Sequence, residues 1–413
     1  MTTSRISTAE AVQRGALECS TAPVDLDKVR RDRLANVHRQ LSRSDLAGVL
    51  LFDQLNVRYA IDATNMQVWC LHNEVRYCFV ATDGPVILFE FGHSDHLTRG
   101  YPGISERRPA RAATYFTSGN RIDEHAREFA REIADVVREH GAGNRRIGID
   151  RMGADLYHAL ANENLDLNDG FALMEEARKI KTPEEIVLMR CAIEASEKGI
   201  RAMRESLRPG LTENALWAKL HEANIAEGGE WIETRLLASG PRTNPWMQEC
   251  SMRVIEKGDM VSFDTDLVGP YGYCSDISRA WICDARPTNE QQRLYMAAME
   301  QLEHNKELLK PGLSFREWSE KAWPIPDEFL ASRYGIIAHG VGLVDEYPAI
   351  AHWEDFAERG YDDIIHPGMV LCVESLVGTE GGREAVKLEQ QLLVTPTGYE
   401  RLDTYPMDET WAS

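Results

Sequence analysis

The N-terminal part of the chain alternates apolar runs with amphipathic stretches. AGVLLFD at 47–53 predicts a buried strand. Two further apolar runs, around 76–82 and 85–91, lie on either side of Asp83-Gly84 and predict a β-hairpin. RIGID at 146–150 predicts another short strand.

Helical stretches separate these strands. Residues 26–42 form a basic helical stretch, and 122–140 has helical periodicity and ends at Gly141, a predicted C-cap. Strands that alternate with helices predict a small α/β domain at 1–178, in which residues 1–25 are a weakly patterned arm. This part of the chain carries no recognisable chemical motif.

The second part, 179–413, contains an internal repeat. ESLRPGLTENALW at 205–217 is similar to ELLKPGLSFREW at 307–318. Each follows a stretch that opens on a threonine and acidic residues, from 182 in one half and from 288 in the other, typical of a capped helix start. The sequence therefore predicts two similar halves, each made of two helices followed by strands.

In the first half, the stretch 258–279 (GDMVSFDTDLVGPYGYCSDISR) predicts two strands joined by a turn. Asp264 and Asp266 are two residues apart, so an extended strand places both on one face. If a hairpin closes across the Gly-Pro turn, Asp276 returns beside them. Buried carboxylates that converge in this way repel one another unless a cation lies among them. A solvated acidic hairpin is the alternative.

The second half carries a matching set of polar residues in apolar runs. His339 lies at the end of the apolar run in IIAHGVGL (336–343). Glu374 lies in the apolar run GMVLCVESL, and Glu389 in EAVKLEQQLLV. Strand alternation could still turn Glu374 outwards, which is the alternative to a buried role.

Together, Asp264, Asp266, Asp276, His339, Glu374 and Glu389 supply five carboxylates and one imidazole. Such an oxygen-rich set suits two divalent ions of Mn, Fe, Co or Zn, bridged by carboxylates and about 3.5–4 Å apart. The sequence shows no cysteine among these residues, which argues against a closed structural zinc site.

Composition narrows the class of protein. The chain has 413 residues, 43% hydrophobic and 27% charged, which is ordinary for a soluble globular protein of two domains. A net charge of −20 argues against a nucleic-acid partner and against docking on anionic membranes. No run of 18 apolar residues, no secretory signal and eight scattered cysteines predict a cytoplasmic protein with reduced thiols.

The metal-ligand pattern resembles one known family. Gly258-Asp259 six residues before Asp264, the YCSDISR segment, HGVGL, PGM before Glu374, and Glu389 are similar to the creatinase, aminopeptidase P and methionine aminopeptidase superfamily. The resemblance covers roughly 175–400 and extends to a creatinase-like N-terminal domain. It implies a "pita-bread" catalytic domain with a pseudo-twofold repeat and a dinuclear metal centre.

The chain departs from the peptidase pattern of that family. Trp246, in Asn-Pro-Trp, stands where peptidases have a histidine, and Asp345 stands where they have a second one. Asp266 replaces a small residue, and Ser375 replaces the proline that follows the ligand Glu374. The two histidines serve peptide hydrolysis, so their loss weakens a peptidase or creatinase interpretation.

These departures resemble the branch of the superfamily that cleaves dimethylsulfoniopropionate by β-elimination. The resemblance implies that Asp266 joins the metal ligands, that Asp345 is the general base, and that Tyr334 belongs to the catalytic residues. It further implies the products dimethyl sulfide and acrylate, and iron as the metal.

The chemistry suits these residue types. A metal that binds the substrate carboxylate stabilises the carbanion-like transition state. Burial of Asp345 beside Leu343 and Val344 would raise its pKa and make it a better base. A sulfonium group prefers an aromatic face, as quaternary ammonium ions do, and Trp246 is the predicted wall, with core packing as the alternative.

Two other classes of function stay open at this point. One is a dinuclear metallopeptidase of the Xaa-Pro aminopeptidase or prolidase kind, because such a centre generates hydroxide whatever its neighbours. The other is a non-catalytic binding scaffold, although such proteins typically lose ligands and every ligand position is filled here. We expect a homodimer, as relatives of this fold commonly are.

Overall fold

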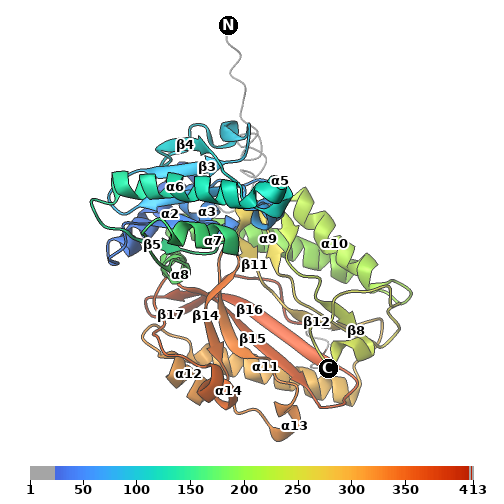
Figure 1. Ribbon diagram of the computed structural model, residues 1–413. Helices are drawn as coiled ribbons and strands as arrows, with labels where there is room; N and C mark the ends of the chain where they lie inside the picture. The colour runs from blue at the N-terminus through green and yellow to red at the C-terminus, as the bar shows by residue number, and fades with distance from the viewer. Residues whose placement is uncertain (1–23, 409–410, 412–413) are drawn as a thin grey trace. The chain divides into compact units, whose positions relative to one another are not determined.

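The described residues form two compact units, one of Asp25–Arg178 and one that begins at Lys179 and also includes Val24. The computed structural model describes residues 24–408 and 411 (Figure 1).

The first unit is built on a six-stranded mixed sheet with the strand order β4-β3-β2-β1-β5-β6. Its strands are β1 Gly48–Leu51, β2 Tyr77–Ala81, β3 Val86–Glu90, β4 Glu106–Pro109, β5 Arg146–Ile149 and β6 Asp166–Asp169. Its helices are α2 Leu26–Leu41, α3 Gln54–Ile61, α4 Gln67–Asn73, α5 Tyr115–Ser118, α6 Ile122–His140, α7 Ala154–Ala161 and α8 Phe171–Arg178.

Local sequence rules explain these elements. The predicted hairpin is confirmed, since β2 pairs antiparallel with β3. The helix 122–140 is also confirmed, with Gly141 as its C-cap, and a side chain would not fit there because a Cβ on Gly141 would lie 2.5 Å from two backbone oxygens. Seven apolar residues of α6 are buried and include Phe129 and Ile133, which join the core of this unit. The result is the mixed α/β domain that the alternating pattern predicts.

Within its described residues, the second unit contains three antiparallel sheets. Two have three strands, in the orders β11-β10-β7 and β12-β9-β8, and one has five, in the order β14-β13-β15-β16-β17. The strands are β7 Trp231–Ile232, β8 Leu237–Ser239, β9 Met260–Phe263, β10 Leu267–Val268, β11 Cys274–Ser275, β12 Arg279–Ile282, β13 Ile336–Val341, β14 Asp345–Ala351, β15 Val370–Gly378, β16 Ala385–Thr395 and β17 Gly398–Arg401.

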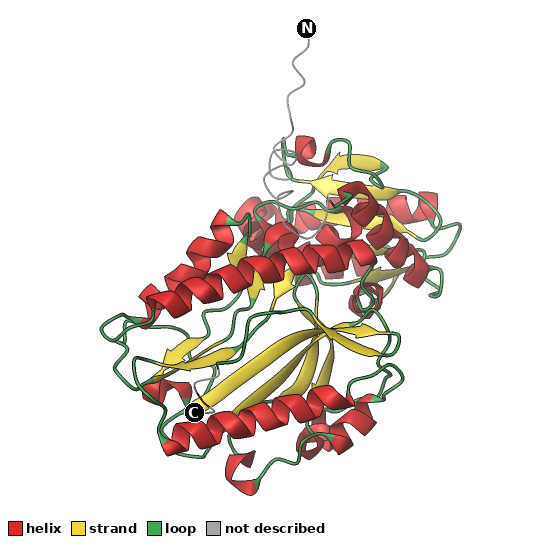
Figure 2. Ribbon diagram, turned by 180° about the vertical axis from the view of Figure 1, so that it is seen from behind, coloured by secondary structure: helices red, strands yellow, loops and turns green. Residues whose placement is uncertain are grey.

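Helices cover these strands from two sides. Helices α9 and α10 pack on the short strands of the first half, and α11 packs on β15 and β16 (Figures 1 and 2). The helices are α9 Pro183–Ser206, α10 Glu213–Ala226, α11 Asn289–Leu308, α12 Phe315–Lys321, α13 Asp327–Leu330 and α14 Trp353–Arg359. The strands that carry the acidic residues therefore lie in the interior of this unit.

The internal repeat is visible in the hydrogen bonds of the two halves. Thr182 and Thr288 cap α9 and α11 with the same reciprocal capping box. At the Pro-Gly-Leu turns, Gly210 N donates to Ile255 O, and Gly312 N donates to Ile365 O in the second half. Both glycines have a positive φ, 90° and 83°, which a residue with a Cβ rarely adopts. The predicted pseudo-twofold fold is confirmed.

Two further expectations concern membranes and thiols. Within the described residues, no helix is long and apolar enough to cross a membrane. Cys191 is disulfide-bonded, so the expectation that every thiol is reduced is wrong at this position. Six other cysteines are free and buried: Cys70, Cys78, Cys250, Cys274, Cys283 and Cys372.

Candidate metal centre

The predicted acidic hairpin closes and brings its three aspartates together. Strand β9 pairs with β12, and β10 with β11. Asp264 and Asp266 lie between β9 and β10 rather than in one extended strand, and Asp266 has a φ of 35°. The expectation of a continuous strand is therefore wrong in this detail. The main-chain N–H of Asp266 nevertheless donates to Asp276 Oδ1 at 3.4 Å.

Thr265, which lies between Asp264 and Asp266, links the two arms of this hairpin. Thr265 Oγ1 donates to Ser275 O at 2.9 Å and accepts from Ile277 N at 2.9 Å. Its side chain is fully buried, so these bonds replace the ladder bonds that the loop lacks. Asp276 is thereby held beside Asp264 without a regular strand.

The two glutamates face each other on neighbouring strands. Glu374 on β15 is the direct antiparallel partner of Glu389 on β16. Their exposed fractions are 1% and 0%. The alternative in which Glu374 turns to solvent is therefore wrong.

His339 completes the set from β13. Its Nε2 lies 3.3 Å from Glu374 Oε1, 3.3 Å from Glu389 Oε1 and 3.6 Å from Asp276 Oδ2. Its Nδ1 lies 3.0 Å from Gly340 O. A tautomer that donates from Nδ1 to this carbonyl leaves the Nε2 lone pair directed at the carboxylates, as a metal ligand requires.

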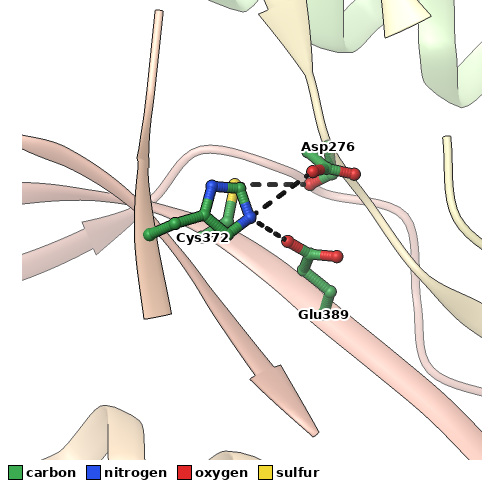
Figure 3. Close-up of side chains that lie close together, drawn as sticks. Asp276, Cys372 and Glu389 are labelled. Atoms are coloured by element: carbon green, nitrogen blue, oxygen red, sulfur yellow. Dashed lines mark hydrogen bonds and ion pairs between the residues drawn. The ribbon is translucent and has the colours of Figure 1, made fainter. Parts of the chain in front are cut away.

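All six predicted ligands fall into groups whose ligand atoms lie within 4.8 Å of one another. The groups are Asp276, His339, Cys372 and Glu389; Asp264, Asp266 and Asp276; and Asp264, Glu374 and Glu389. In Figure 3, the side chains of Asp276 and Glu389 point toward the same space, with Cys372 beside them.

Sequence reasoning missed Cys372 as a member of this cluster. It lies on β15, opposite His339 in the register, and its Sγ is 3.8 Å from Asp276 O. The available signal was its position two residues before Glu374, which puts both side chains on one face of the strand.

Sequence reasoning also missed Lys387, a fully buried ammonium in contact with the acidic residues. Its Nζ lies 2.8 Å from Asp264 Oδ2, 2.7 Å from Glu374 Oε2 and 2.8 Å from Glu389 Oε2. It also donates to Ser278 Oγ at 2.9 Å. Its signal was the spacing K-x-E in an apolar strand, which puts the lysine on the same face as Glu389.

Burial and mutual repulsion shape the acidity of the metal-free cluster. Burial raises the pKa of Asp276 well above its usual range, and the charge of Asp264 raises it further. Burial likewise raises the pKa of Glu374, against the effect of Lys387. The pKa of Glu389 lies below its usual range. Burial acts to raise it, but the contacts with Lys387 and His339 together have the larger effect. A cation among these groups would relieve the repulsion.

The donor set fits a divalent metal. Glu374 Oε1 and Glu389 Oε1 are buried and have no hydrogen-bond partner among the described residues. Both lie against His339 Nε2, but one ring nitrogen can satisfy at most one of them. Carboxylate oxygens with one imidazole are ligands for Mn, Fe, Co or Zn, so an ion here would satisfy both oxygens.

Asp345 lies at the edge of this cluster. Its Oδ1 is 3.6 Å from His339 Nδ1, and 49% of its side chain is exposed. The expectation that Asp345 is buried is therefore wrong. Partial desolvation still raises its pKa, with His339 opposing and Glu389 reinforcing the shift.

Tyr334 lies beside Lys387, and Trp246 belongs to a small apolar group against which Tyr334 packs. The Tyr334 ring centroid is 5.0 Å from Lys387 Nζ. Trp246 is 7% exposed and packs with Leu376 and Ala385, and Tyr334 packs against this group. The indole Nε1 of Trp246 is buried and has no hydrogen-bond partner among the described residues.

Residues 187–396 match the metallopeptidase family M24. The chain belongs to this family. It is 44% identical over 93% of its length to "Dimethylsulfoniopropionate lyase DddP" of Roseovarius nubinhibens, of which it covers 87%. It is 42% identical, with the same coverage, to the lyase of that name from Roseobacter denitrificans. The expected resemblance to the lyase branch is confirmed.

Other similar proteins are peptidases by name. The "Xaa-Pro dipeptidase" of Pyrococcus furiosus is 30% identical over 56% of this chain and 64% of that protein. The solved Xaa-Pro dipeptidase from Bacillus anthracis has a TM-score of 0.73 at 21% identity, covering 92% of this chain and 99% of that one. The likeness to this structure shows the shared fold.

Proposed function

We propose that this protein is a metal-dependent lyase that cleaves dimethylsulfoniopropionate to dimethyl sulfide and acrylate. The observation that carries the proposal is a half-exposed carboxylate, Asp345, beside a buried cluster of acidic residues and His339. The identity to two lyases named for this reaction, over 93% of the chain, supports the same substrate.

The metal ligands of the proposal are Asp264, Asp266, Asp276, His339, Glu374 and Glu389. Their donor atoms already lie close together, and two carboxylate oxygens among them lack hydrogen-bond partners in the described part of the chain. We propose two divalent ions, iron in the first place and Mn, Zn or Co as alternatives. When bound, they supply Lewis-acid stabilisation of charge on the substrate carboxylate.

Asp345 is the proposed base. Its carboxylate removes a proton from the carbon next to the substrate carboxylate. The electron pair of that C–H bond becomes the carbon–carbon π bond of acrylate. The bond from the β-carbon to sulfur breaks, and its electrons leave with dimethyl sulfide. The exposed half of Asp345 lets the captured proton pass to water.

Trp246 and Tyr334 are the proposed aromatic contacts of the sulfonium end. Both pack in one small apolar cluster with Leu376, and the Tyr334 ring lies over the Lys387 ammonium. A sulfonium carries a full positive charge without N–H donors, so it gains more from an aromatic face than from a hydrogen-bond acceptor. Tyr334 is also the second candidate for the base.

The experiment that tests the proposal is a headspace assay. Purified protein loaded with iron is incubated with dimethylsulfoniopropionate, and dimethyl sulfide is measured against a chelator-treated sample. We expect gas only from the loaded protein, with acrylate in equal amount. An iron-loaded protein that retains its metal and releases no dimethyl sulfide would contradict the lyase proposal.

A second candidate is an Xaa-Pro aminopeptidase or prolidase activity, favoured by membership of family M24 and by the buried metal-type cluster. Release of an N-terminal residue from Xaa-Pro peptides at ordinary turnover would support it. Asp345 in place of a histidine argues against efficient hydrolysis.

We further propose that the protein works as a homodimer in the cytoplasm. Light scattering of the purified protein tests the first point, because a monomer mass of 46.7 kDa would contradict it.

A further inference from the structure

Lys387 is surrounded by the same carboxylates that make up the proposed metal centre. Its ammonium lies 2.8 Å or less from one oxygen each of Asp264, Glu374 and Glu389. Those three residues are also one of the groups whose ligand atoms could hold a metal ion. An ammonium therefore occupies a cation position of this cluster, supplied by the chain itself.

The two oxygens of each glutamate face different partners, Lys387 and His339. Oε2 of Glu374 and of Glu389 faces Lys387, while Oε1 of both lies 3.3 Å from His339 Nε2. The Oε1 atoms are the ones that have no hydrogen-bond partner in the described part of the chain. Lys387 thus orients the carboxylates so that their remaining oxygens face the histidine side.

The charges fit this division. Five carboxylates and one ammonium leave four negative charges, which two divalent ions neutralise. Without the ammonium the metal-free cluster would hold five carboxylates, fully or largely buried, and His339 would be the one basic side chain of the described residues in contact with them. Buried like charges of this kind destabilise the fold unless they are paired.

We infer that Lys387 is a positioning residue and a built-in cation of the metal centre: its ammonium and the metal ions neutralise the same carboxylates and partly substitute for one another. The inference rests on the metal centre of the proposed function. It predicts that metal ions stabilise the fold more when the ammonium is absent, because each cation gains less where another has already acted.

The test compares melting temperatures with and without metal, and it uses no substrate. Wild type, Lys387→Met and Lys387→Gln are stripped with a chelator, and each is then melted alone and with saturating Mn²⁺. We expect both variants to melt lower than wild type when stripped. We expect Mn²⁺ to raise their melting temperatures by at least about 4 °C more than it raises that of wild type.

Lys306→Met is the matched control. Lys306 is also a buried lysine, 5% exposed, but its Nζ bonds Glu303 at 2.6 Å and the amide of Gln390, away from the candidate ligands. Its loss should lower stability while leaving the Mn²⁺-induced rise equal to that of wild type. This separates a cost of losing any buried lysine from a role coupled to metal.

Two outcomes would overturn the inference. One is an Mn²⁺-induced rise in both Lys387 variants that is no larger than in wild type. The other is that neither variant folds even with saturating Mn²⁺, since metal then fails to replace the ammonium. Variants that unfold on stripping and refold with Mn²⁺ support it. A failed lyase assay leaves the melting result standing, so the two proposals fail separately.

Discussion

Asp345 Oδ1 lies 3.6 Å from His339 Nδ1, on the opposite side of the ring from the Nε2 atom that faces Glu374 and Glu389. The imidazole therefore separates a half-exposed carboxylate from the buried ones. A group in this place can contact a substrate held by the metal centre without being a metal ligand itself. This relationship makes Asp345 the sharpest target for mutation.

Asp345→Asn should keep the shape of the side chain and remove its basic oxygen. We expect turnover of dimethylsulfoniopropionate to fall by about 10²–10⁴-fold, the contribution typical of a general base. Metal content and melting temperature should change little, because the side chain is half exposed and not among the ligands. Near-wild-type turnover in metal-loaded Asp345→Asn would remove Asp345 as the base, and Tyr334→Phe would then be tested.

Asp266→Ala should lower metal content and lyase activity together. One of its carboxylate oxygens lies within 4.8 Å of oxygens of Asp264 and Asp276. Thr234 Oγ1 donates a hydrogen bond to its Oδ2. Losing one of five negative charges weakens the attraction for divalent ions. Metal analysis by mass spectrometry checks this, with Thr234→Val as the control that keeps the carboxylate. Full metal occupancy with unchanged turnover would show that Asp266 is not a metal ligand.

The sequence predicts the cluster well where ligand type and strand position decide it. Carboxylates in apolar runs are predicted to be buried next to other charged groups, and Glu374 and Glu389 are direct partners across β15 and β16. The Gly-Pro turn likewise predicts that Asp276 returns to Asp264. These inferences depend only on periodicity and on the cost of buried charge.

Other features depend on tertiary contacts that no local pattern encodes. The K-x-E spacing places Lys387 on the face of Glu389, but it does not predict the contact with Asp264, which lies in the loop between β9 and β10. The exposure of Asp345 depends on the elements around β14 rather than on its apolar neighbours in sequence. The left-handed φ of Asp266 reflects how the loop joins two separate sheets.

A buried histidine away from the metal centre should make stability depend on pH. His352 is 2% exposed, and burial lowers its pKa to about 4, with Arg333 adding to the effect and Asp355 opposing it. The folded state therefore favours the neutral ring, and its stability is fully present above the unfolded pKa of about 6.5. As the pH falls from 6.5 toward 4, this contribution to the free energy of unfolding is lost, by about 3 kcal/mol at most.

Unfolding by denaturant at several pH values checks this prediction. His352→Gln removes the titrating ring, so its free energy of unfolding should fall less than that of wild type between pH 6.5 and about 4. His366→Gln changes an exposed histidine of the same unit and should keep the wild-type slope. Equal slopes in wild type and His352→Gln would contradict the assignment.

Glu213 should be essential for the segment that carries Trp246. Its fully buried carboxylate accepts from the N–H and hydroxyl of Ser239, from the N–H and hydroxyl of Ser251, and from Arg242. Glu213→Ala leaves these donors unpaired, and we expect a loss of about 3–5 kcal/mol in the free energy of unfolding. Glu249→Ala breaks an exposed pair with Arg235 and should cost less than about 1 kcal/mol. A small effect at Glu213 would mean that the segment is held by other contacts.

Trp246 offers a test of how the sulfonium group is recognised. If its ring is a wall of the site, Trp246→Leu should raise KM for dimethylsulfoniopropionate by roughly 2–30-fold, corresponding to the 0.5–2 kcal/mol of a cation–π contact. Trp246→Phe keeps an aromatic face and should raise KM less than the leucine variant does. If Trp246 only packs against Leu376 and Ala385, both variants lose stability through the cavity they leave. In that case KM would not separate phenylalanine from leucine, and melting temperature alone would fall. The order of the two KM values, measured at matched metal content, therefore decides between recognition and packing.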